Sequence, residues 1–163
     1  MRIGIGWDSH KFRKGIALKI GGVRLEHASG LAGHSDGDVL LHALTDALLG
    51  AVAAGDIGSY FPPSDRKWKG ADSALFVHEA LKRVARAGYA ITNVDSTLIL
   101  ASPKIGPHAK QIQRRVAQLL GIGPASVGIK AKTPEGLGLK NTAIAQVVVL
   151  LVRRKSKSRA TRR

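Results

Sequence analysis

Two histidines and an aspartate stand where their side chains can meet around one metal ion. Asp8 and His10 are two residues apart in a segment that is typical of a strand, so both side chains leave the same face. His42, in the next predicted helix, is the best third ligand. Two histidines and one carboxylate with an open fourth position suit catalytic zinc. The alternative is that each is an ordinary polar residue near the end of its element.

The predicted helix around His42 carries acidic residues on the same face. Asp38, His42 and Asp46 follow one another at i, i+4 spacing, which places them in one row. A metal-bound imidazole usually donates its other N–H to a carboxylate, and we expect Asp38 or Asp46 to accept it. A solvated acidic stripe is the alternative.

Phosphate and hydroxyl contacts are expected just before this helix and in a short acidic loop. His34 and Ser35 stand where the first free N–H groups of the helix would meet a phosphate, although Ser35 could be an N-cap alone. Asp56 lies between two glycines, which suits contacts of main chain and carboxylate with vicinal hydroxyls. Most loops of this kind are only turns.

Two further loops, residues 102–107 and 132–138, follow predicted strands. Ligands gather at the carboxyl ends of strands in open α/β sheets, and Lys104, Lys132 and Thr133 can contact phosphate oxygens there. Glu135 suits Mg²⁺, which is commonly held by a single carboxylate together with phosphates and water. Each loop could also be a proline-stiffened connection.

Alternating elements predict an α+β fold, a two-layer α/β sandwich in which helices cover one face of a mixed sheet. The other face of such a sheet is apolar, and oligomerisation is the simplest way to cover it. Periodicity, capping and turn signals place the helices at 35–49, 73–87 and 107–120, and the strands at 2–10, 17–20, 23–25, 91–100, 127–132 and 143–152.

The net charge of +15 is unevenly distributed along the 163 residues. We expect one domain over residues 1–152 and a basic, disordered tail over 153–163, which holds seven positive charges. Nucleic acid would bind weakly, through this tail, if at all. Without a signal-like or membrane-length apolar segment, a soluble, cytoplasmic protein with no membrane partner is expected. The absence of cysteine excludes thiolate chemistry and disulfides.

Five ordered motifs together resemble one family, 2-C-methyl-D-erythritol 2,4-cyclodiphosphate synthase. They are Gly4-x-Gly6-x-Asp8-x-His10, His34-Ser35-Asp36-Gly37-Asp38-x-x-x-His42-Ala43-x-x-Asp46, Gly55-Asp56-Ile57-Gly58, Pro103-Lys104 and Lys130-Ala131-x-Thr133-x-Glu135. The resemblance implies cyclisation of 4-diphosphocytidyl-2-C-methyl-D-erythritol 2-phosphate with release of CMP. It also implies a homotrimer, in which the sheets pack together and the active sites lie between subunits.

The resemblance assigns roles to residues of this chain. It implies that Asp8, His10 and His42 bind zinc, that Glu135 binds Mg²⁺ or Mn²⁺, and that His34 and Thr133 are catalytic, as transition-state stabilisers. The implied substrate contacts in the first half of the chain are Asp8, Ser9, His10, His34, Ser35, Asp56, Ile57, Gly58, Phe61, Pro62, Pro63, Ser64 and Asp65. A cytidine and diphosphate pocket of the adjacent subunit is implied at Leu100, Ala101, Ser102, Pro103, Lys104, Ile105, Gly106, Lys132, Thr133, Pro134 and Glu135.

Two other functions fit part of the pattern. A metal-dependent phosphohydrolase would use the same metal and phosphate features with water as nucleophile. A basic nucleic-acid-binding module fits the charge, but aromatic residues make up only 4% of the chain, so few platforms for base stacking are available.

Overall fold

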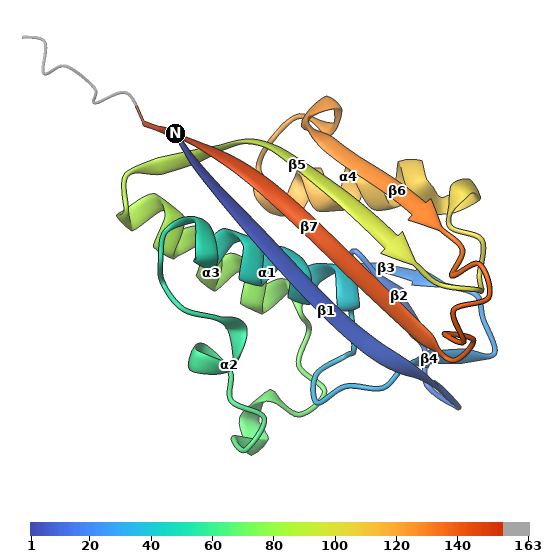
Figure 1. The fold of residues 1–163 in the computed structure, drawn as a ribbon. Helices are drawn as coiled ribbons and strands as arrows, with labels where there is room; N and C mark the ends of the chain where they lie inside the picture. Colours follow the sequence, from blue (N-terminus) through green and yellow to red (C-terminus); the bar gives the residue numbers. More distant parts are fainter. Residues whose placement is uncertain (155–163) are drawn as a thin grey trace, which may run out of the picture.

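The computed structural model describes residues 1–154, which form one five-stranded sheet, a two-stranded hairpin and helices on one face of the larger sheet (Figure 1). The strands are β1 (Arg2–Lys14), β2 (Leu18–Ile20), β3 (Val23–Leu25), β4 (Ser29–Leu31), β5 (Tyr89–Ile99), β6 (Val127–Lys132) and β7 (Thr142–Arg153). The helices are α1 (Val39–Ala51), α2 (Ile57–Tyr60), α3 (Ala74–Arg86) and α4 (Ala109–Leu120), with 3-10 turns η1 (Arg66–Trp68), η2 (Gly106–His108) and η3 (Pro124–Ser126).

The large sheet is mixed, as the alternating elements predict. Its strand order is β4-β1-β7-β5-β6, and the β5–β6 pair is parallel while the other pairs are antiparallel. Strands β1 and β7 pair from Arg2 opposite Leu151 to Lys11 opposite Thr142. The parallel pair directs the carboxyl ends of β5 and β6 to one edge, where the loops after both strands meet.

Strand β1 lies unusually close to α1 because two of its residues have no side chain. A Cβ atom on Gly4 would be 1.9 Å from the carbonyl oxygen of Ala47, and one on Gly6 would be 1.9 Å from that of Ala43. Since side chains alternate along a strand, the face of β1 that carries these glycines also carries Asp8 and His10. The close approach therefore brings both residues to the same helix that carries His42.

The face of the sheet opposite the helices is apolar and open in the single chain. Ile3, Ile5 and Trp7 of β1 are 69%, 62% and 57% exposed, and Val148 and Val152 of β7 are also exposed. On the inner face, alternate residues of β7 from Ala143 to Leu151 are fully buried. The prediction of helices on one face is thus confirmed.

Several predicted boundaries are wrong. Helix α1 begins at Val39, because Asp38 rather than Ser35 is its N-cap and accepts a hydrogen bond from Leu41 N. Gly37, with a φ of +74°, lies in the turn that leads into the helix, and α1 continues through Gly50 to Ala51. Strand β1 continues past His10 to Lys14, and β5 begins earlier than predicted, at Tyr89, and ends at Ile99. The segment predicted as a loop after Asp56 forms the short helix α2.

The predicted tail begins at Arg153, which is the last residue of β7 and lies opposite Tyr89. Residues 155–163 lie outside the described residues. None of the helices in residues 1–154 has the length and apolar character that crossing a membrane requires.

Candidate metal centre and substrate pockets

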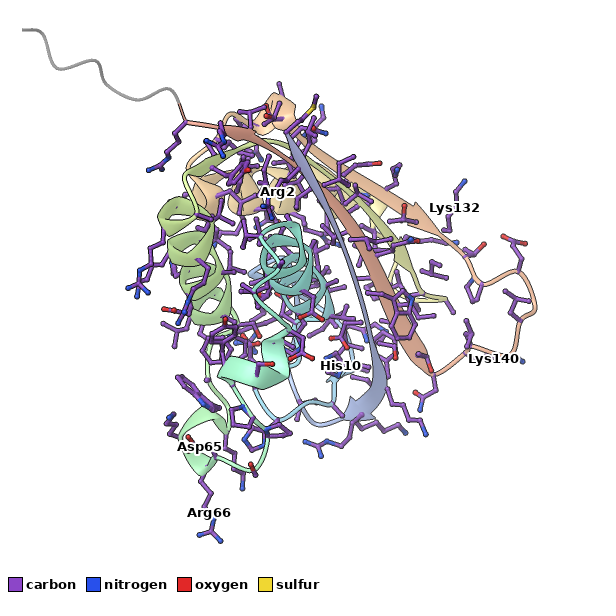
Figure 2. The ribbon with its side chains drawn as sticks, turned by 60° about the vertical axis from the view of Figure 1, so that its left-hand side comes forward. Arg2, His10, Asp65, Arg66, Lys132 and Lys140 are labelled. Atoms are coloured by element: carbon purple, nitrogen blue, oxygen red, sulfur yellow. The ribbon has the colours of Figure 1, made fainter. Side chains whose placement is uncertain are left out.

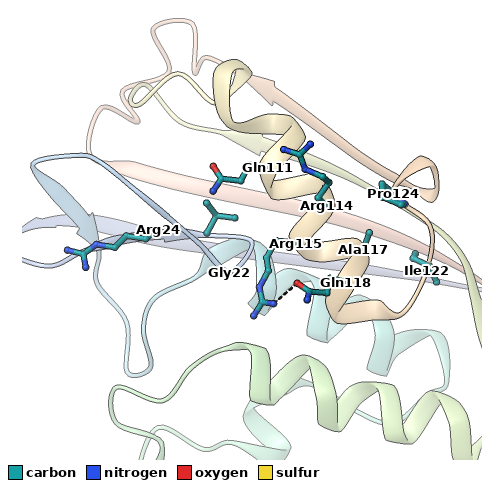
Figure 3. Close-up of a pocket in the computed structure, with 10 residues that line it drawn as sticks. Gly22, Arg24, Gln111, Arg114, Arg115, Ala117, Gln118, Ile122 and Pro124 are labelled. Atoms are coloured by element: carbon teal, nitrogen blue, oxygen red, sulfur yellow. Dashed lines mark hydrogen bonds between the residues drawn. The ribbon is translucent and has the colours of Figure 1, made fainter.

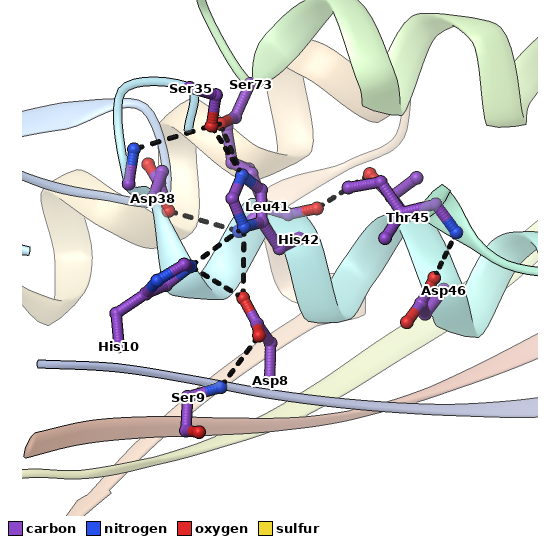
Figure 4. Close-up of polar contacts among 12 residues, drawn as sticks. Asp8, Ser9, His10, Ser35, Asp38, Leu41, His42, Thr45, Asp46 and Ser73 are labelled. Carbon is purple, nitrogen blue, oxygen red and sulfur yellow. Dashed lines mark hydrogen bonds and ion pairs between the residues drawn. The ribbon is translucent and has the colours of Figure 1, made fainter. Parts of the chain in front are cut away.

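Asp8, His10 and His42 form a compact group between β1 and α1 (Figure 4). His10 Nε2 and His42 Nδ1 are 3.0 Å apart, and Asp8 Oδ2 lies 2.9 Å from the first nitrogen and 3.0 Å from the second. Three potential ligand atoms therefore occupy the corners of a nearly equilateral triangle. All three side chains are largely buried, which makes an uncompensated charge at this place costly.

The triangle has the dimensions of one face of a tetrahedral metal site. Zinc bonds to nitrogen and oxygen of about 2.0–2.1 Å imply that neighbouring ligand atoms are about 3.3 Å apart. The three observed separations, 2.9–3.0 Å, are only slightly shorter. The donor set of two imidazoles and one carboxylate also suits zinc. The residues present therefore fit a metal ion that keeps its fourth position for another ligand.

Neighbouring groups orient the three side chains. The backbone N–H of Ser9 donates to Asp8 Oδ1 at 2.8 Å, and the ring of His10 forms a hydrogen bond with the backbone of Ala32. His42 Nε2 lies 2.8 Å from Ser35 Oγ and 2.9 Å from Ser73 Oγ. The Nε2 atom of His42 is thus occupied, and its Nδ1 atom faces the triangle.

His42 donates to neither Asp38 nor Asp46 in the described residues, so that expectation is wrong. Asp38 is fully buried and accepts hydrogen bonds from the backbone nitrogens of Gly21, Gly22 and Leu41. Asp46 accepts from Ile57 N at 2.7 Å and so fixes the start of α2. Asp38, His42 and Asp46 do lie in one row on α1. The two carboxylates, however, accept hydrogen bonds from backbone N–H groups and not from His42.

Electrostatics at the triangle favours an ionised carboxylate. Burial alone would raise the pKa of Asp8, but hydrogen bonds and attraction from His10 and His42 outweigh burial and hold that pKa well below its usual range. Burial also opposes the charge of His10, yet the contact with Asp8 raises the pKa of His10 above its ordinary value. At Asp38 and Asp46, burial raises the pKa in spite of the backbone hydrogen bonds.

A pocket of about 170 Å³ opens beside the triangle. Eight of its lining residues are predicted site residues: His10, His34, Ser35, His42, Ile57, Gly58, Phe61 and Pro63. Trp68 and Phe76 complete the lining and were not predicted. Their rings pack with Phe61, at centroid distances of 4.8 Å for Trp68 and 4.3 Å for Phe76. This aromatic wall leaves no signal in sequence spacing, since its parts come from the end of α2, from η1 and from α3.

The other predicted residues of the first half are not among those that line this pocket. His34 Nε2 lies 3.3 Å from the carbonyl oxygen of Asp65, which joins the 61–65 loop to the segment before α1. Asp56 is exposed and caps α2 by accepting from Ser59 N. Ser9 contributes its backbone N–H to Asp8, but its side chain leaves the opposite face of β1 from the triangle.

A second pocket, of about 360 Å³, lies where β5 and β6 end. It brings together predicted residues of two loops, namely Leu100, Pro103, Lys104, Ile105, Gly106, Lys132 and Thr133, with Pro107 and Ala131. Ala101 and Ser102 are exposed in the first of these loops, and Thr133 donates a hydrogen bond to Glu135 in the second, where Pro134 is buried. This pocket shares no lining residue with the pocket at the triangle, and Lys132 lies well apart from His10 (Figure 2).

A hollow of about 760 Å³, larger than either of these two pockets, lies beside α4 and contains none of the predicted site residues (Figure 3). Its charged lining consists of Arg24, Arg114 and Arg115, the last hydrogen-bonded to Gln118. No histidine or carboxylate lines it. The candidate ligands and donors instead gather at the two smaller pockets described above.

Fold and site together define an α+β protein with two histidines and one aspartate that could hold a metal ion beside a small pocket. The chain belongs to the YgbB family, whose model matches residues 1–152.

Named relatives agree with this membership. A 2-C-methyl-D-erythritol 2,4-cyclodiphosphate synthase of Koribacter versatilis is 66% identical over 154 residues, covering 94% of this chain and 99% of the relative. The enzyme of the same name from Bordetella avium is 53% identical, covering 93% of this chain and 96% of the relative. A solved structure of a 2C-methyl-D-erythritol-2,4-cyclodiphosphate synthase, described as the CDP-bound form, matches with a TM-score of 0.87 and 40% identity, covering 93% of this chain and all of that one.

Proposed function

We propose that this protein converts 4-diphosphocytidyl-2-C-methyl-D-erythritol 2-phosphate to 2-C-methyl-D-erythritol 2,4-cyclodiphosphate and CMP. The observation that carries the proposal is the triangle of Asp8, His10 and His42 beside a pocket in a chain 66% identical to an enzyme of that name. The reaction belongs to non-mevalonate isoprenoid biosynthesis.

The substrate supplies its own nucleophile. An oxygen of the 2-phosphate, largely dianionic at neutral pH, forms a bond to the β-phosphorus of the diphosphate. The bond from that phosphorus to the bridging oxygen breaks, and CMP leaves with the electron pair. The protein has to hold two anionic groups in line, and correct orientation of an intramolecular attack can supply about 7–11 kcal/mol of the barrier. No serine or histidine of the chain has to be activated as a nucleophile.

Asp8, His10 and His42 would hold zinc, and Glu135 would hold Mg²⁺ or Mn²⁺ on the diphosphate. Bound there, the two ions supply positive charge to phosphate oxygens at which negative charge develops. Ser35 and Thr133 offer hydroxyl donors, and His34 offers a ring nitrogen beside the pocket at the triangle. His34 and Thr133 are the residues to which we assign stabilisation of the transition state.

The substrate would be held from both of its ends. Ile57 and Gly58 line the pocket beside the triangle, and Asp56 directly precedes them with an exposed carboxylate. This carboxylate and the main-chain groups suit the hydroxyls of the erythritol. Lys104 in the loop after β5 and Lys132 at the end of β6 suit a cytidine diphosphate. These two groups of residues line separate pockets of the chain, so a neighbouring copy has to bring the second pocket to the first.

A homotrimer packed through the open face of the sheet would bring the pockets together. The exposed Ile3, Ile5 and Trp7 form a row along β1 on this face, and Val148 lies on the adjacent strand β7. Burial of this row against other copies would remove apolar surface from water, at about 25 cal/mol for each Å². The active sites would then lie between subunits.

The test is a product assay with purified protein and the diphosphocytidyl substrate. His42→Ala should abolish CMP release, whereas His78→Ala, which removes an exposed histidine of α3, should leave it intact. Phosphorus NMR then identifies the product: a cyclic diphosphate supports the proposal, and free phosphate would indicate a metal-dependent phosphohydrolase. Full activity of a zinc-free His42→Ala protein would overturn it.

A further inference from the structure

Ser73 is a fully buried serine whose hydroxyl meets the metal-site histidine from the side opposite the metal (Figure 4). Its Oγ lies 2.9 Å from His42 Nε2 and 2.5 Å from Asp36 Oδ1. It is also 3.2 Å from the Oγ of Ser35, which itself contacts His42 Nε2 at 2.8 Å. Neither Ser73 nor Asp36 is among the residues assigned to metal or substrate above.

The directions of these hydrogen bonds follow from the chemistry of the partners. An ionised carboxylate only accepts, so the hydroxyl hydrogen of Ser73 points to Asp36. The oxygen of Ser73 is then left to accept, and its two neighbours are His42 Nε2 at 2.9 Å and Ser35 Oγ at 3.2 Å. The shorter contact is satisfied when Nε2 carries a hydrogen. Lys19 Nζ donates to the other oxygen of Asp36 at 3.0 Å, which keeps that carboxylate in its accepting role.

This direction favours the Nε2–H tautomer of His42. With the hydrogen on Nε2, the lone pair of Nδ1 points at the triangle, toward Asp8 and His10. A metal ligand has to present this lone pair. With the opposite tautomer, a hydrogen on Nδ1 would occupy the place of the ion.

Ser73 stands at the start of α3 but does not serve that helix as a cap. It makes no side-chain capping hydrogen bond, and the N–H of Ala74 is satisfied instead by Asp72 Oδ1 at 2.9 Å. Removal of the Ser73 hydroxyl therefore costs α3 no cap. The hydroxyl is free to orient His42.

We propose that Asp36 and Ser73 are positioning residues that hold His42 in its Nε2–H tautomer and thereby strengthen zinc binding at the site of the proposed function. These hydrogen bonds run from Lys19 through Asp36 and Ser73 to His42. They connect β2, the segment before α1 and the start of α3 to one imidazole.

The first measurement is zinc affinity by competition with a chromophoric chelator at one fixed pH. Ser73→Ala should bind zinc about tenfold more weakly than the unsubstituted protein, the lower end of the range for loss of such partners, because Ser35 still contacts the imidazole. Ser96→Ala is the matched control: Ser96 is also buried, and its hydroxyl donates to Gly128 O far from the metal site. It should leave the affinity unchanged.

The second measurement is the tautomer itself, by proton–nitrogen correlation NMR of the imidazoles in zinc-free protein. In zinc-free protein Asp8 Oδ2, 3.0 Å from His42 Nδ1, competes for the hydrogen by accepting from Nδ1–H, so the test is the difference between the proteins. The fraction of His42 in the Nε2–H form should be smaller in Ser73→Ala than in the unsubstituted protein. Asp36→Asn gives a second variant of nearly equal size, and it should shift the tautomer in the same direction because its amide can donate to Ser73.

The outcomes separate this inference from the proposed function. Failure of the unsubstituted protein to bind zinc would count against the proposed metal site, while the NMR result would still decide the role of Ser73. Equal zinc affinity and an unchanged tautomer in Ser73→Ala would overturn the inference.

Discussion

Asp38→Ala should strongly destabilise the protein and leave the metal site largely intact. Asp38 is fully buried and accepts three backbone hydrogen bonds, from Gly21 N at 2.9 Å, Gly22 N at 2.6 Å and Leu41 N at 3.1 Å. It therefore joins the turn between β2 and β3 to the start of α1. Its carboxylate does not touch His42.

The magnitude follows from these three bonds. Loss of the helix cap at Leu41 costs about 1 kcal/mol. A buried N–H left without a partner, as at Gly21, costs about 1–3 kcal/mol, while Gly22 is partly exposed and can turn to water at a smaller cost. We expect Asp38→Ala to lower the free energy of unfolding by about 3–4 kcal/mol. Asp38→Asn keeps one acceptor oxygen and should lose about half as much.

Chemical denaturation at one protein concentration measures this loss, and chelator competition measures zinc affinity in the folded protein. A loss below about 1 kcal/mol for Asp38→Ala would refute the reasoning. So would a fall in zinc affinity as large as that of His42→Ala, since it would mean that Asp38 acts on the metal site and not on the turn.

Two other predictions concern the surface. Glu79 forms an ion pair with Arg83. Burial alone would raise the pKa of Glu79, but its ion pairs lower that pKa in the folded protein. The stability that Glu79 contributes is therefore present above its pKa in the unfolded chain and is lost as the pH falls through its pKa in the folded protein. Glu79→Gln should therefore cost about 0.5 kcal/mol near neutral pH and nothing in strong acid; denaturation at several pH values measures this, and a pH-independent difference would contradict it. Trp7→Glu should convert the proposed trimer to smaller species and abolish CMP release. Leu75→Glu, at a similarly exposed apolar position on α3, should do neither. Light scattering measures the oligomeric state, and an intact oligomer of Trp7→Glu would rule out the open face of the sheet as the interface.

The sequence predicted the metal triangle because its members obey simple periodicities. Asp8 and His10 share a strand face at period two, and the glycines at positions 4 and 6 on that same face allow α1 to approach. The loops after β5 and β6 were predicted by the same reasoning, since strand ends and glycine or proline turns are visible in a single chain. The boundaries of α1 were less well predicted, because Ser35 and Asp38 are both good N-caps and only the surrounding fold selects between them.

Sequence alone thus determined the mixed fold, the three candidate ligands and the loops that carry the candidate phosphate-binding side chains. Only the tertiary structure decided which groups hold those ligands in place. Spacing on one helix shows that Asp38 and Asp46 share a face with His42, but it does not show what packs against that face. In the folded protein Ser73, 31 residues further along the chain, meets the imidazole, while the two aspartates turn to backbone N–H groups. A buried polar group forms its hydrogen bond with a partner that the packing of the protein places nearby. Which partner that is depends on the fold as a whole.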